Sequence, residues 1–296
     1  MTTAAVEISS AERASSLTLG GDMRVHRLGF GAMRLTGKGI WGPPPDRNAA
    51  LATLRRAVEL GVNFIDTADS YGPNVSEELI AEALTPYPKD LVIATKGGWE
   101  RSGPAEWLHN AGPQHLEKAV AGSLKRLRVD RIDLYQLHAP DPAVSFDASV
   151  EALAKMREQG KIRHIGLSNV TKEHVKRARK IVPIVSVQNR YSFSDREYDY
   201  LVDYCEANGI AFVPWNPIAQ NRDANEVVEK IAAARKVSTI VVSLAWLLRR
   251  SPIILPIPGT SSAKHVEENI GAASFSLTDA EFAELAAVRP VPYSLR

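Results

Sequence analysis

Short apolar runs alternate with segments of helical periodicity along most of the chain. The apolar runs, which are typical of buried strands, occupy residues 28–30, 63–66, 91–96, 132–138, 164–169, 185–190, 211–215 and 253–257. Helical spacing is found at residues 47–60, 76–84, 114–127, 146–159, 172–181, 196–208, 226–235 with 238–249, and again within 263–288. Strict alternation of strand and helix indicates a parallel α/β sheet. Eight such units favour a closed (β/α)8 barrel, the TIM barrel, over an open doubly wound sheet.

Two further short strands are predicted ahead of the barrel. Residues 17–19 and 23–25 flank a Gly-Gly-Asp sequence, which is a strong hairpin signal. We expect this N-terminal β-hairpin to cap the bottom of the barrel. Residues 1–15 are small, polar and weakly charged, without the features of a signal peptide, so a disordered tail is expected there. No linker or shift in composition divides residues 16–296, which are interpreted as a single barrel domain.

Composition excludes several classes of function. Hydrophobic residues make up 45% and charged residues 24% of the chain, as in an ordinary globular enzyme. The formal net charge of +2 gives no general attraction to nucleic acid or to a membrane surface, and no segment is long enough to span a bilayer. The single cysteine, Cys205, allows no intrachain disulfide, which favours a reducing, cytoplasmic location. The seven histidines lack metal-ligand spacing, so no metal site is expected.

Four reactive side chains are predicted to meet at one end of the barrel. Chemistry in this fold gathers at the carboxyl ends of the strands. Asp66 ends the second strand, Tyr71 lies in the turn beyond it, and Lys96 and His138 end the next two strands. Taken singly, such residues are often helix caps or satisfied buried groups. Their convergence on one mouth is what predicts a catalytic site.

The chemistry open to this set is narrow. An ammonium beside a tyrosine hydroxyl favours its ionised form, so we expect Lys96 to lower the Tyr71 pKa from about 10 toward neutrality. Asp66 would keep Lys96 charged and in place, and His138 could donate a hydrogen bond to a substrate oxygen. Such a group protonates a carbonyl oxygen as negative charge develops there. The hydride has to come from a cofactor, because no side chain supplies one.

The chain resembles the aldo-keto reductase superfamily in a series of motifs that run in family order. They are residues 66–72 (DTADSYG), 95–96, 137–138, 166–169, 187–189 and 257–260. The resemblance implies a reductase that uses NADPH/NADP+, with Tyr71 as the acid. It also implies that Ser168, Asn169 and Gln188 hold the nicotinamide carboxamide and that Trp215 stacks on the nicotinamide ring, as donor and acceptor groups and a flat aromatic would allow.

The binding of the coenzyme's phosphate end is less typical. Many family members carry basic residues after the last strand that grip the adenosine 2′-phosphate, whereas the matching positions here are Gly259 and His265. Hydroxyl groups, a lysine and backbone amides at the start of the next helix are expected to replace them; alternatively, the hydroxyls only cap that helix. The coenzyme-binding residues expected outside the carboxamide site are Gly31, Gly259, Thr260, Ser261, Ser262, Lys264, His265, Glu268 and Asn269.

A finer resemblance points to bacterial pyridoxal reductases. It is carried by residues 31–35 with 41–44, 164–170, and 258–262 with His265. Residues 97–112, rich in glycine, proline and aromatic residues, are expected to form a loop over the mouth. The side chains expected to wall the substrate pocket are Met33, Trp41, Trp99, Trp107 and Tyr191.

Two other functions remain open from sequence. Lys96 could act as the Schiff-base nucleophile of a barrel aldolase, although that requires a neutral lysine and Asp66 opposes it. Barrels resembling this family also serve as cofactor-sensing channel subunits with slow redox chemistry. For the enzyme we expect a small-molecule carbonyl substrate and a monomer or weak homo-oligomer.

Overall fold

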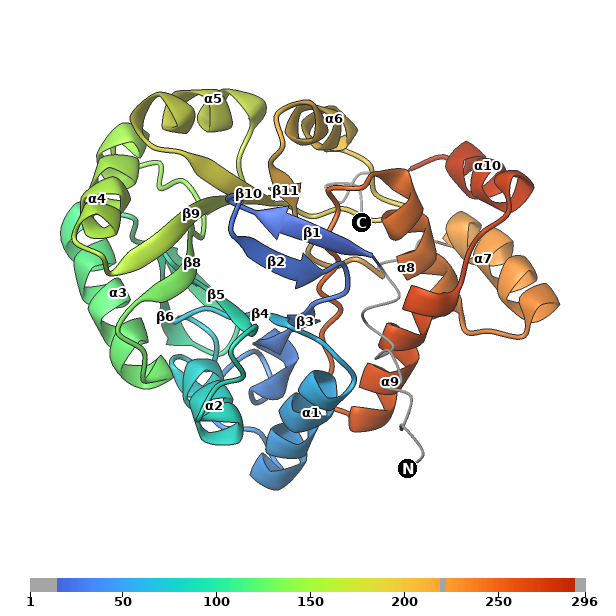
Figure 1. The fold of residues 1–296 in the computed structure, drawn as a ribbon, viewed down its shortest axis with the longest axis horizontal. Helices are drawn as coiled ribbons and strands as arrows, with labels where there is room; N and C mark the ends of the chain where they lie inside the picture. The colour runs from blue at the N-terminus through green and yellow to red at the C-terminus, as the bar shows by residue number, and fades with distance from the viewer. Residues whose placement is uncertain (1–14, 219–221, 291–296) are drawn as a thin grey trace, which may run out of the picture.

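The computed structural model describes residues 15–218 and 222–290, so the tail expected over residues 1–15 lies outside the described residues, apart from Ser15. Helices surround a central sheet (Figure 1). The strands are β1 (Ser16–Leu19), β2 (Met23–His26), β3 (Phe30–Gly31), β4 (Phe64–Asp66), β5 (Val92–Gly97), β6 (Trp99–Gly103), β7 (Glu106–His109), β8 (Ile132–Leu137), β9 (Ile162–Ser168), β10 (Ile184–Gln188) and β11 (Ala211–Phe212). The helices are α1 (Arg47–Glu59), α2 (Val75–Leu84), α3 (Pro113–Leu127), α4 (Phe146–Glu158), α5 (Lys172–Ile181), α6 (Asp199–Ala207), α7 (Arg222–Arg235), α8 (Thr239–Arg250), α9 (Ala263–Gly271) and α10 (Asp279–Ala287), with 3-10 turns η2 (Ala32–Leu35) and η3 (Ala272–Ser274).

The central sheet is parallel, with the strand order β11-β10-β9-β8-β5-β4-β3. Its register brings the carboxyl ends of the strands to a common edge: Gly31 is opposite Asp66, and Gln188 is opposite Ser168. Residues far apart in sequence therefore meet at that edge.

An extended segment at residues 253–258 joins the two edges of this sheet. On one side Ile254 bridges Phe212, and the Leu255 amide donates to the Phe212 carbonyl at 2.9 Å. On the other side the Gly29 amide donates to the Pro256 carbonyl at 2.9 Å. These bonds close the sheet into an α/β barrel. The segment forms no regular strand because its prolines have no amide hydrogen to donate to a ladder.

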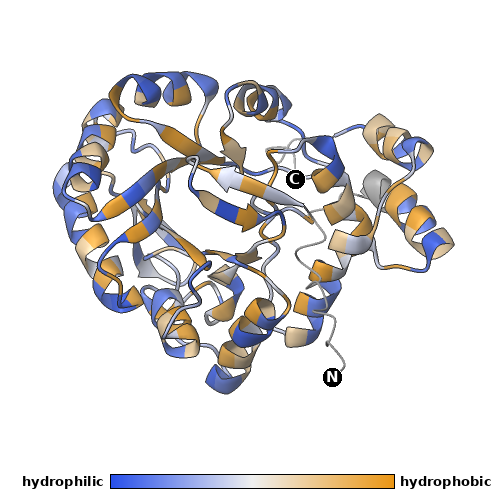
Figure 2. Cartoon of the chain, viewed as in Figure 1, coloured by the Kyte–Doolittle hydropathy of each residue, from blue (hydrophilic) through white to orange (hydrophobic). Residues whose placement is uncertain are grey.

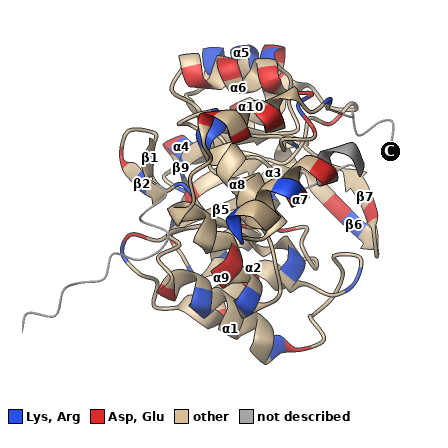
Figure 3. Ribbon diagram, turned by 90° about the vertical axis from the view of Figure 1, so that its right-hand side faces the viewer, with Lys and Arg blue, Asp and Glu red and all other residues tan. Residues whose placement is uncertain are grey.

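Two apolar layers hold the barrel together. Alternate strand residues face the surrounding helices, whose inner faces are apolar (Figure 2). The other strand residues, such as Phe64 and Leu134, form a smaller buried cluster. Leu19, Met23 and Val25 of the β1–β2 hairpin belong to the same cluster, so this hairpin packs against the barrel interior. The β6–β7 hairpin lies on the opposite side of the molecule (Figure 3).

One segment differs in kind from its sequence expectation. Residues 97–112 do not form a plain loop, because β6 and β7 pair as an antiparallel hairpin. Trp99 is paired with His109, and their rings lie 3.9 Å apart between centroids. The glycine and proline residues of this segment suggest a loop. The cross-strand contact between the two rings instead stabilises a hairpin.

No single helix within residues 15–218 and 222–290 is long and apolar enough to cross a membrane. Residues Glu226–Arg235 of α7 together with α8 have sufficient length and apolar character, but the pair is bent by 102°. The same part of the chain contains no group of three or more His, Cys, Asp or Glu side chains able to hold a metal ion.

Candidate active site

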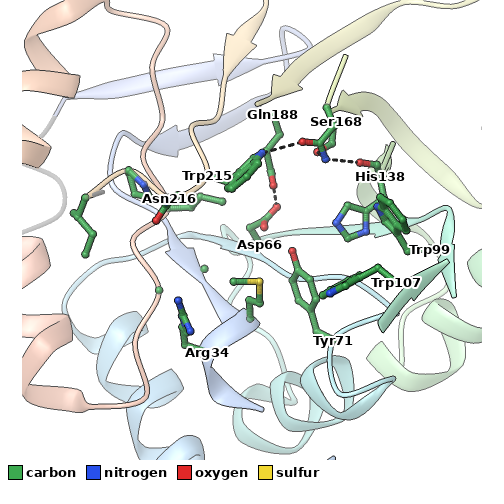
Figure 4. A pocket seen from close by; sticks show the side chains of 17 residues that line it. Arg34, Asp66, Tyr71, Trp99, Trp107, His138, Ser168, Gln188, Trp215 and Asn216 are labelled. Atoms are coloured by element: carbon green, nitrogen blue, oxygen red, sulfur yellow. Dashed lines mark hydrogen bonds between the residues drawn. The ribbon is translucent and has the colours of Figure 1, made fainter. Parts of the chain in front are cut away.

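A cavity of about 540 Å³ opens at the carboxyl ends of the barrel strands (Figure 4). Asp66, Tyr71 and His138 line it, and Lys96 lies fully buried beneath them. The structure thus brings together the four side chains singled out as catalytic.

A short hydrogen-bonded chain forms the floor of this cavity. The Lys96 ammonium donates to Asp66 Oδ1 at 2.6 Å, to the Thr67 carbonyl at 2.9 Å and to the Tyr71 hydroxyl at 3.4 Å. All of its three donors therefore have a partner. Because both Lys96 and Asp66 are buried, their pairing is required for either to stay charged.

The turn after β4 holds Tyr71 through its own backbone. The Tyr71 amide donates to the Ala68 carbonyl at 3.2 Å, and the Asn74 amide donates to the Asp69 carbonyl at 2.7 Å. The Asp69 amide in turn donates to the Lys96 carbonyl at 3.2 Å, which fastens the turn to β5. The tyrosine is thereby placed beside the lysine by short-range and cross-strand bonds together.

Two glutamines complete the hydrogen bonding of Asp66. The amide nitrogens of Gln188 and Gln136 donate to Asp66 Oδ2 at 2.8 and 3.2 Å. Gln188 also lines the cavity. Its amide nitrogen therefore supports the carboxylate, which leaves its amide oxygen as the group able to accept from a ligand.

His138 stands next to the phenol. Its ring centroid lies 5.8 Å from that of Tyr71, and its Nδ1 is 3.4 Å from the Ser70 hydroxyl. His138 lines the cavity together with Trp99 and Trp107, whose rings both lie 6.4 Å from the imidazole between centroids (Figure 4). A ligand oxygen placed above the Tyr71 hydroxyl would have the imidazole within reach.

Burial dominates the proton affinities of these groups. It raises the pKa of Tyr71, and the Lys96 ammonium offsets only part of that rise. The expected lowering of the Tyr71 pKa toward neutrality is therefore wrong for this site. Burial also lowers the Lys96 pKa, but the charges and hydrogen bonds of Asp66 and Tyr71 together outweigh burial and leave that pKa above its usual value. For His138, burial and the Lys96 charge hold the pKa well below its usual range. At neutral pH the site thus presents a neutral phenol, an ammonium and a neutral imidazole.

The opposite wall combines an indole with amide and hydroxyl groups. Trp215 donates from Nε1 to Asn169 Oδ1 at 3.1 Å, and Asn169 Nδ2 donates to the His138 carbonyl at 2.9 Å and to the Ser168 hydroxyl at 3.2 Å. Asn169 adopts a positive φ of 55°, an uncommon conformation that aims this side chain along the wall. The half-exposed indole is fixed at its edge by this bond, and Trp215 lines the cavity.

Gly31 and Gly259 meet at the third side of the cavity. A Cβ on Gly31 would lie 2.6 Å from the Ile257 carbonyl oxygen, and one on Gly259 would lie 2.8 Å from the Gly31 carbonyl oxygen. Both positions therefore require glycine, because β3 and the segment that closes the barrel (residues 253–258, followed by Gly259) approach each other closely here.

The segment beyond Gly259 leads out of the cavity along the start of α9. Thr260 accepts from the Ser262 amide at 3.1 Å and lies 3.3 Å from His265 Nδ1. Ser262 is the residue before α9, but its hydroxyl makes no capping bond. Ser262 therefore does not act as a helix cap through its side chain, contrary to the alternative that these hydroxyls serve only as caps. The remaining expected residues on this stretch are exposed Ser261, Lys264 and His265, half-buried Glu268 and buried Asn269.

Comparison with known proteins identifies the family. Residues 27–290 match the aldo/keto reductase family. The chain belongs to the aldo/keto reductase family. It is 48% identical to an uncharacterized oxidoreductase of Schizosaccharomyces pombe (96% of this chain, 92% of the relative) and 45% identical to pyridoxine 4-dehydrogenase of Escherichia coli (88% and 93%). An aldo-keto reductase from Klebsiella pneumoniae, solved in complex with NADPH, superimposes with a TM-score of 0.79 at 27% identity (94% and 96%).

The family resemblance predicted from sequence is thereby confirmed, and the chain is an oxidoreductase. Six of the residues expected at the coenzyme site of this aldo/keto reductase line the cavity: Gly31, Ser168, Asn169, Gln188, Trp215 and Gly259. Three of the expected substrate-pocket residues do so as well, namely Met33, Trp99 and Trp107.

Two residues expected in the pocket of this aldo/keto reductase lie elsewhere. Tyr191 points outward into the layer between strands and helices, where its ring packs on Phe212 and Trp246 and its hydroxyl donates to Asp199. Trp41 lies in the neighbouring loop, bridged to Gly72, and does not line the cavity. Sequence does not reveal which side of the barrel wall a residue after a strand end will face.

Several lining residues of the aldo/keto reductase site were missed. Arg34, Asn216, Pro217, Ile218 and Ile257 border the cavity. Gln136 was missed too, although a signal existed: it stands two residues before His138 on β8, and alternate strand residues share a face.

Proposed function

We propose that this protein reduces an aldehyde or ketone carbonyl to an alcohol with NADPH. The observation that carries the proposal is the buried, hydrogen-bonded series Asp66–Lys96–Tyr71 opening onto a cavity beside a neutral His138. When bound, NADPH supplies the hydride. The protein's own task is then to deliver a proton to the carbonyl oxygen.

Tyr71 is the proton donor in this proposal. Its raised pKa keeps the phenol protonated at neutral pH, so that the proton is available. The Lys96 ammonium, 3.4 Å from the hydroxyl, stabilises the phenolate that forms on transfer. Neutral His138 donates a hydrogen bond to the same substrate oxygen and orients it. Asp66, held by both glutamines, keeps Lys96 in position.

The residues of the opposite wall fit the nicotinamide end of the coenzyme. Ser168, Asn169 and Gln188 provide hydroxyl and amide groups for its carboxamide, and Trp215 offers an indole face to the ring. The hydroxyls of residues 260–262, with Lys264 and His265, would hold the 2′-phosphate end. The structure of the Klebsiella pneumoniae relative with NADPH supports the choice of coenzyme.

A Schiff-base role for Lys96 is disfavoured. Its ammonium is paired with Asp66 at 2.6 Å, and its pKa lies above the usual value. A nucleophilic amine has to be neutral at working pH. Lys96 is therefore a charge-stabilising group and not a nucleophile.

Pyridoxal is the first substrate to test, because pyridoxine 4-dehydrogenase of Escherichia coli is 45% identical to this chain. A panel of aldehydes and ketones that includes pyridoxal, followed by the absorbance of NADPH, tests the proposal. We expect aldehyde-dependent oxidation of NADPH. A protein that binds NADPH but reduces none of the panel would instead be a coenzyme sensor.

The proposed acid sets the pH dependence. Reduction requires protonated Tyr71, whose pKa is raised above its usual 10, so the rate should stay level through neutral pH and fall only in alkali. Oxidation of the alcohol requires the phenolate and should rise with pH over the same range. The measurement is kcat in both directions from pH 6 to pH 11, a range chosen around the tyrosine pKa of about 10. A fall in the reduction rate centred near neutrality would contradict the assignment.

Trp215 should report coenzyme binding. We expect NADPH to quench tryptophan fluorescence, because the Trp215 indole borders the cavity, and we expect Trp215→Ala to lose most of the quench. Trp41→Phe is the matched control, since Trp41 does not line the cavity. An unchanged quench in Trp215→Ala would count against stacking.

We further propose that the chain has a single barrel domain, predicted from sequence over residues 16–296, and that the β1–β2 hairpin caps the bottom of the barrel. The protein acts in the cytoplasm on a small molecule, as a monomer or weak homo-oligomer, without nucleic acid or membrane.

A further inference from the structure

Arg101, on β6, binds three separate segments around the mouth of the cavity. Its guanidinium donates to the carbonyls of Gly39 (3.0 Å) and Ile40 (2.8 Å) in the loop before α1. It donates to the Ser70 carbonyl at 3.0 Å in the turn that carries Tyr71. The bonds inside the β6–β7 hairpin go to the carbonyls of Glu106 (2.7 Å) and Gly103 (3.3 Å).

These bonds use every donor that an arginine has. Nε makes one bond and each terminal nitrogen makes two, and a guanidinium carries five N–H groups. Arg101 therefore has no donor left for an anionic substrate or for the coenzyme. Its guanidinium instead binds backbone carbonyls of the protein itself.

The same guanidinium supports the aromatic wall of the cavity. It lies 3.9 Å from the centroid of the Trp107 ring and 5.7 Å from that of Trp41. Trp107 in turn meets Tyr71 edge-on at 6.5 Å and Trp99 edge-on at 6.1 Å. The position of the wall opposite the phenol thus depends on Arg101.

Three mutually contacting aromatic rings form this wall of the cavity. Trp99, Trp107 and His138 contact one another with interplanar angles between 79° and 89°, and all three line the cavity. A flat ring packed against them from the cavity meets ring faces and edges, the arrangements that aromatic groups prefer. A small aliphatic aldehyde needs no such wall to reach Tyr71.

We propose that Arg101 is a positioning residue that holds the β6–β7 hairpin over the substrate end of the cavity and thereby sets a preference for flat aromatic carbonyl compounds. This inference rests on the proposed reductase function. It assigns no contact between Arg101 and the substrate, because the effect passes through Trp107.

Arg101→Met tests the inference, with Arg101→Lys as the conservative variant. For an aromatic aldehyde we expect the KM of Arg101→Met to rise about tenfold, with kcat and the KM for propanal changed less than about twofold. The affinity for NADPH should not change. Arg101→Lys should recover little, since a compact ammonium cannot reproduce the fork of five donors. Arg55→Met is the control, because among the residues that the structure describes exposed Arg55 donates to the Ala83 carbonyl on α2 alone.

Hydrogen exchange supplies a readout that does not depend on turnover. Amides of residues 37–42 and 99–109 should exchange faster in Arg101→Met, while those of the barrel strands stay protected. If wild-type protein reduces no aldehyde, the proposed function fails. The exchange measurement still tests whether Arg101 holds the β6–β7 hairpin in place. Unchanged exchange and an unchanged aromatic KM would overturn the inference, as would an equal rise in KM for both aldehydes.

A second variant tests the inference even if Arg101→Met does not fold. Trp107→Leu removes the indole through which Arg101 acts, and we expect the same selective rise in KM for the aromatic aldehyde. Where both variants fold, the double variant should show no more than the larger single effect, since the two side chains act as one unit. An aromatic KM that stays at the wild-type value in Trp107→Leu, or fully additive effects, would contradict the proposal.

Discussion

Tyr71→Phe is expected to slow aldehyde-dependent oxidation of NADPH by about a thousandfold or more, a loss of the size found for general acids acting with electrostatic support. The substitution removes only the hydroxyl that lies 3.4 Å from the Lys96 ammonium. The ring can keep its edge-on contacts with Trp107 and His138. Kd for NADPH, measured by fluorescence quenching, should therefore stay within about twofold of wild type, and the loss should appear in kcat.

Tyr135→Phe is the matched control for this variant. Tyr135 is fully buried on β8, and its hydroxyl has no hydrogen-bond partner among the described residues. It points away from the cavity, into the layer between strands and helices. We expect Tyr135→Phe to keep wild-type turnover. Tyr71→Phe with more than about a tenth of the wild-type kcat would rule out the phenol as the proton donor.

Lys96→Met is expected to impair both turnover and stability. Turnover should fall by at least about a hundredfold, because the phenolate loses its adjacent positive charge. The free energy of unfolding should fall by about 3–5 kcal/mol, as when one partner of a buried ion pair is removed. The cause is Asp66, whose carboxylate would stay buried and, within the described part of the chain, would keep the two glutamine amides as its donors. Urea denaturation and kcat measure the two effects.

A double variant separates the two roles of Lys96. In Lys96→Met with Asp66→Asn, the buried unpaired charge is gone, so part of the lost stability should return. Turnover should stay as low as in Lys96→Met alone, because the ammonium is still missing. Recovery of turnover along with stability would show that Lys96 contributes only to folding.

The alternation of strands and helices made a closed barrel predictable from sequence, but the form of its closing segment was not predictable. The eighth apolar run, residues 253–257, meets both sheet edges through isolated bonds, because Pro256 within it and Pro258 directly after it have no amide hydrogen to donate to a ladder. The β6–β7 hairpin was not predicted either. Its pairing depends on the contact of Trp99 with His109, ten residues apart, and local turn signals do not encode such a contact.

The convergence of Asp66, Tyr71, Lys96 and His138 could be predicted because each stands at a strand end or in the turn after one, and the carboxyl ends of the strands gather at one end of a barrel. The proton affinity of Tyr71 could not, because it depends on how far burial outweighs the nearby Lys96. Tyr191 was misplaced for a related reason: it follows β10 yet turns into the helical layer toward Trp246. Arg101 could not be singled out from sequence, because it belongs to no motif and its bonds go to backbone carbonyls on distant segments.

Transfer of deuterium from the coenzyme tests the central claim most directly. Wild-type protein would be incubated with pyridoxal and NADPH labelled with deuterium at the transferable position, and the alcohol would be analysed by mass spectrometry. Hydride transfer with a proton from Tyr71 predicts one deuterium on the former carbonyl carbon, and about a thousandfold less of this labelled alcohol in a parallel reaction with Tyr71→Phe run for the same time. An unlabelled alcohol, or a pyridoxal adduct on Lys96 trapped by borohydride, would contradict it.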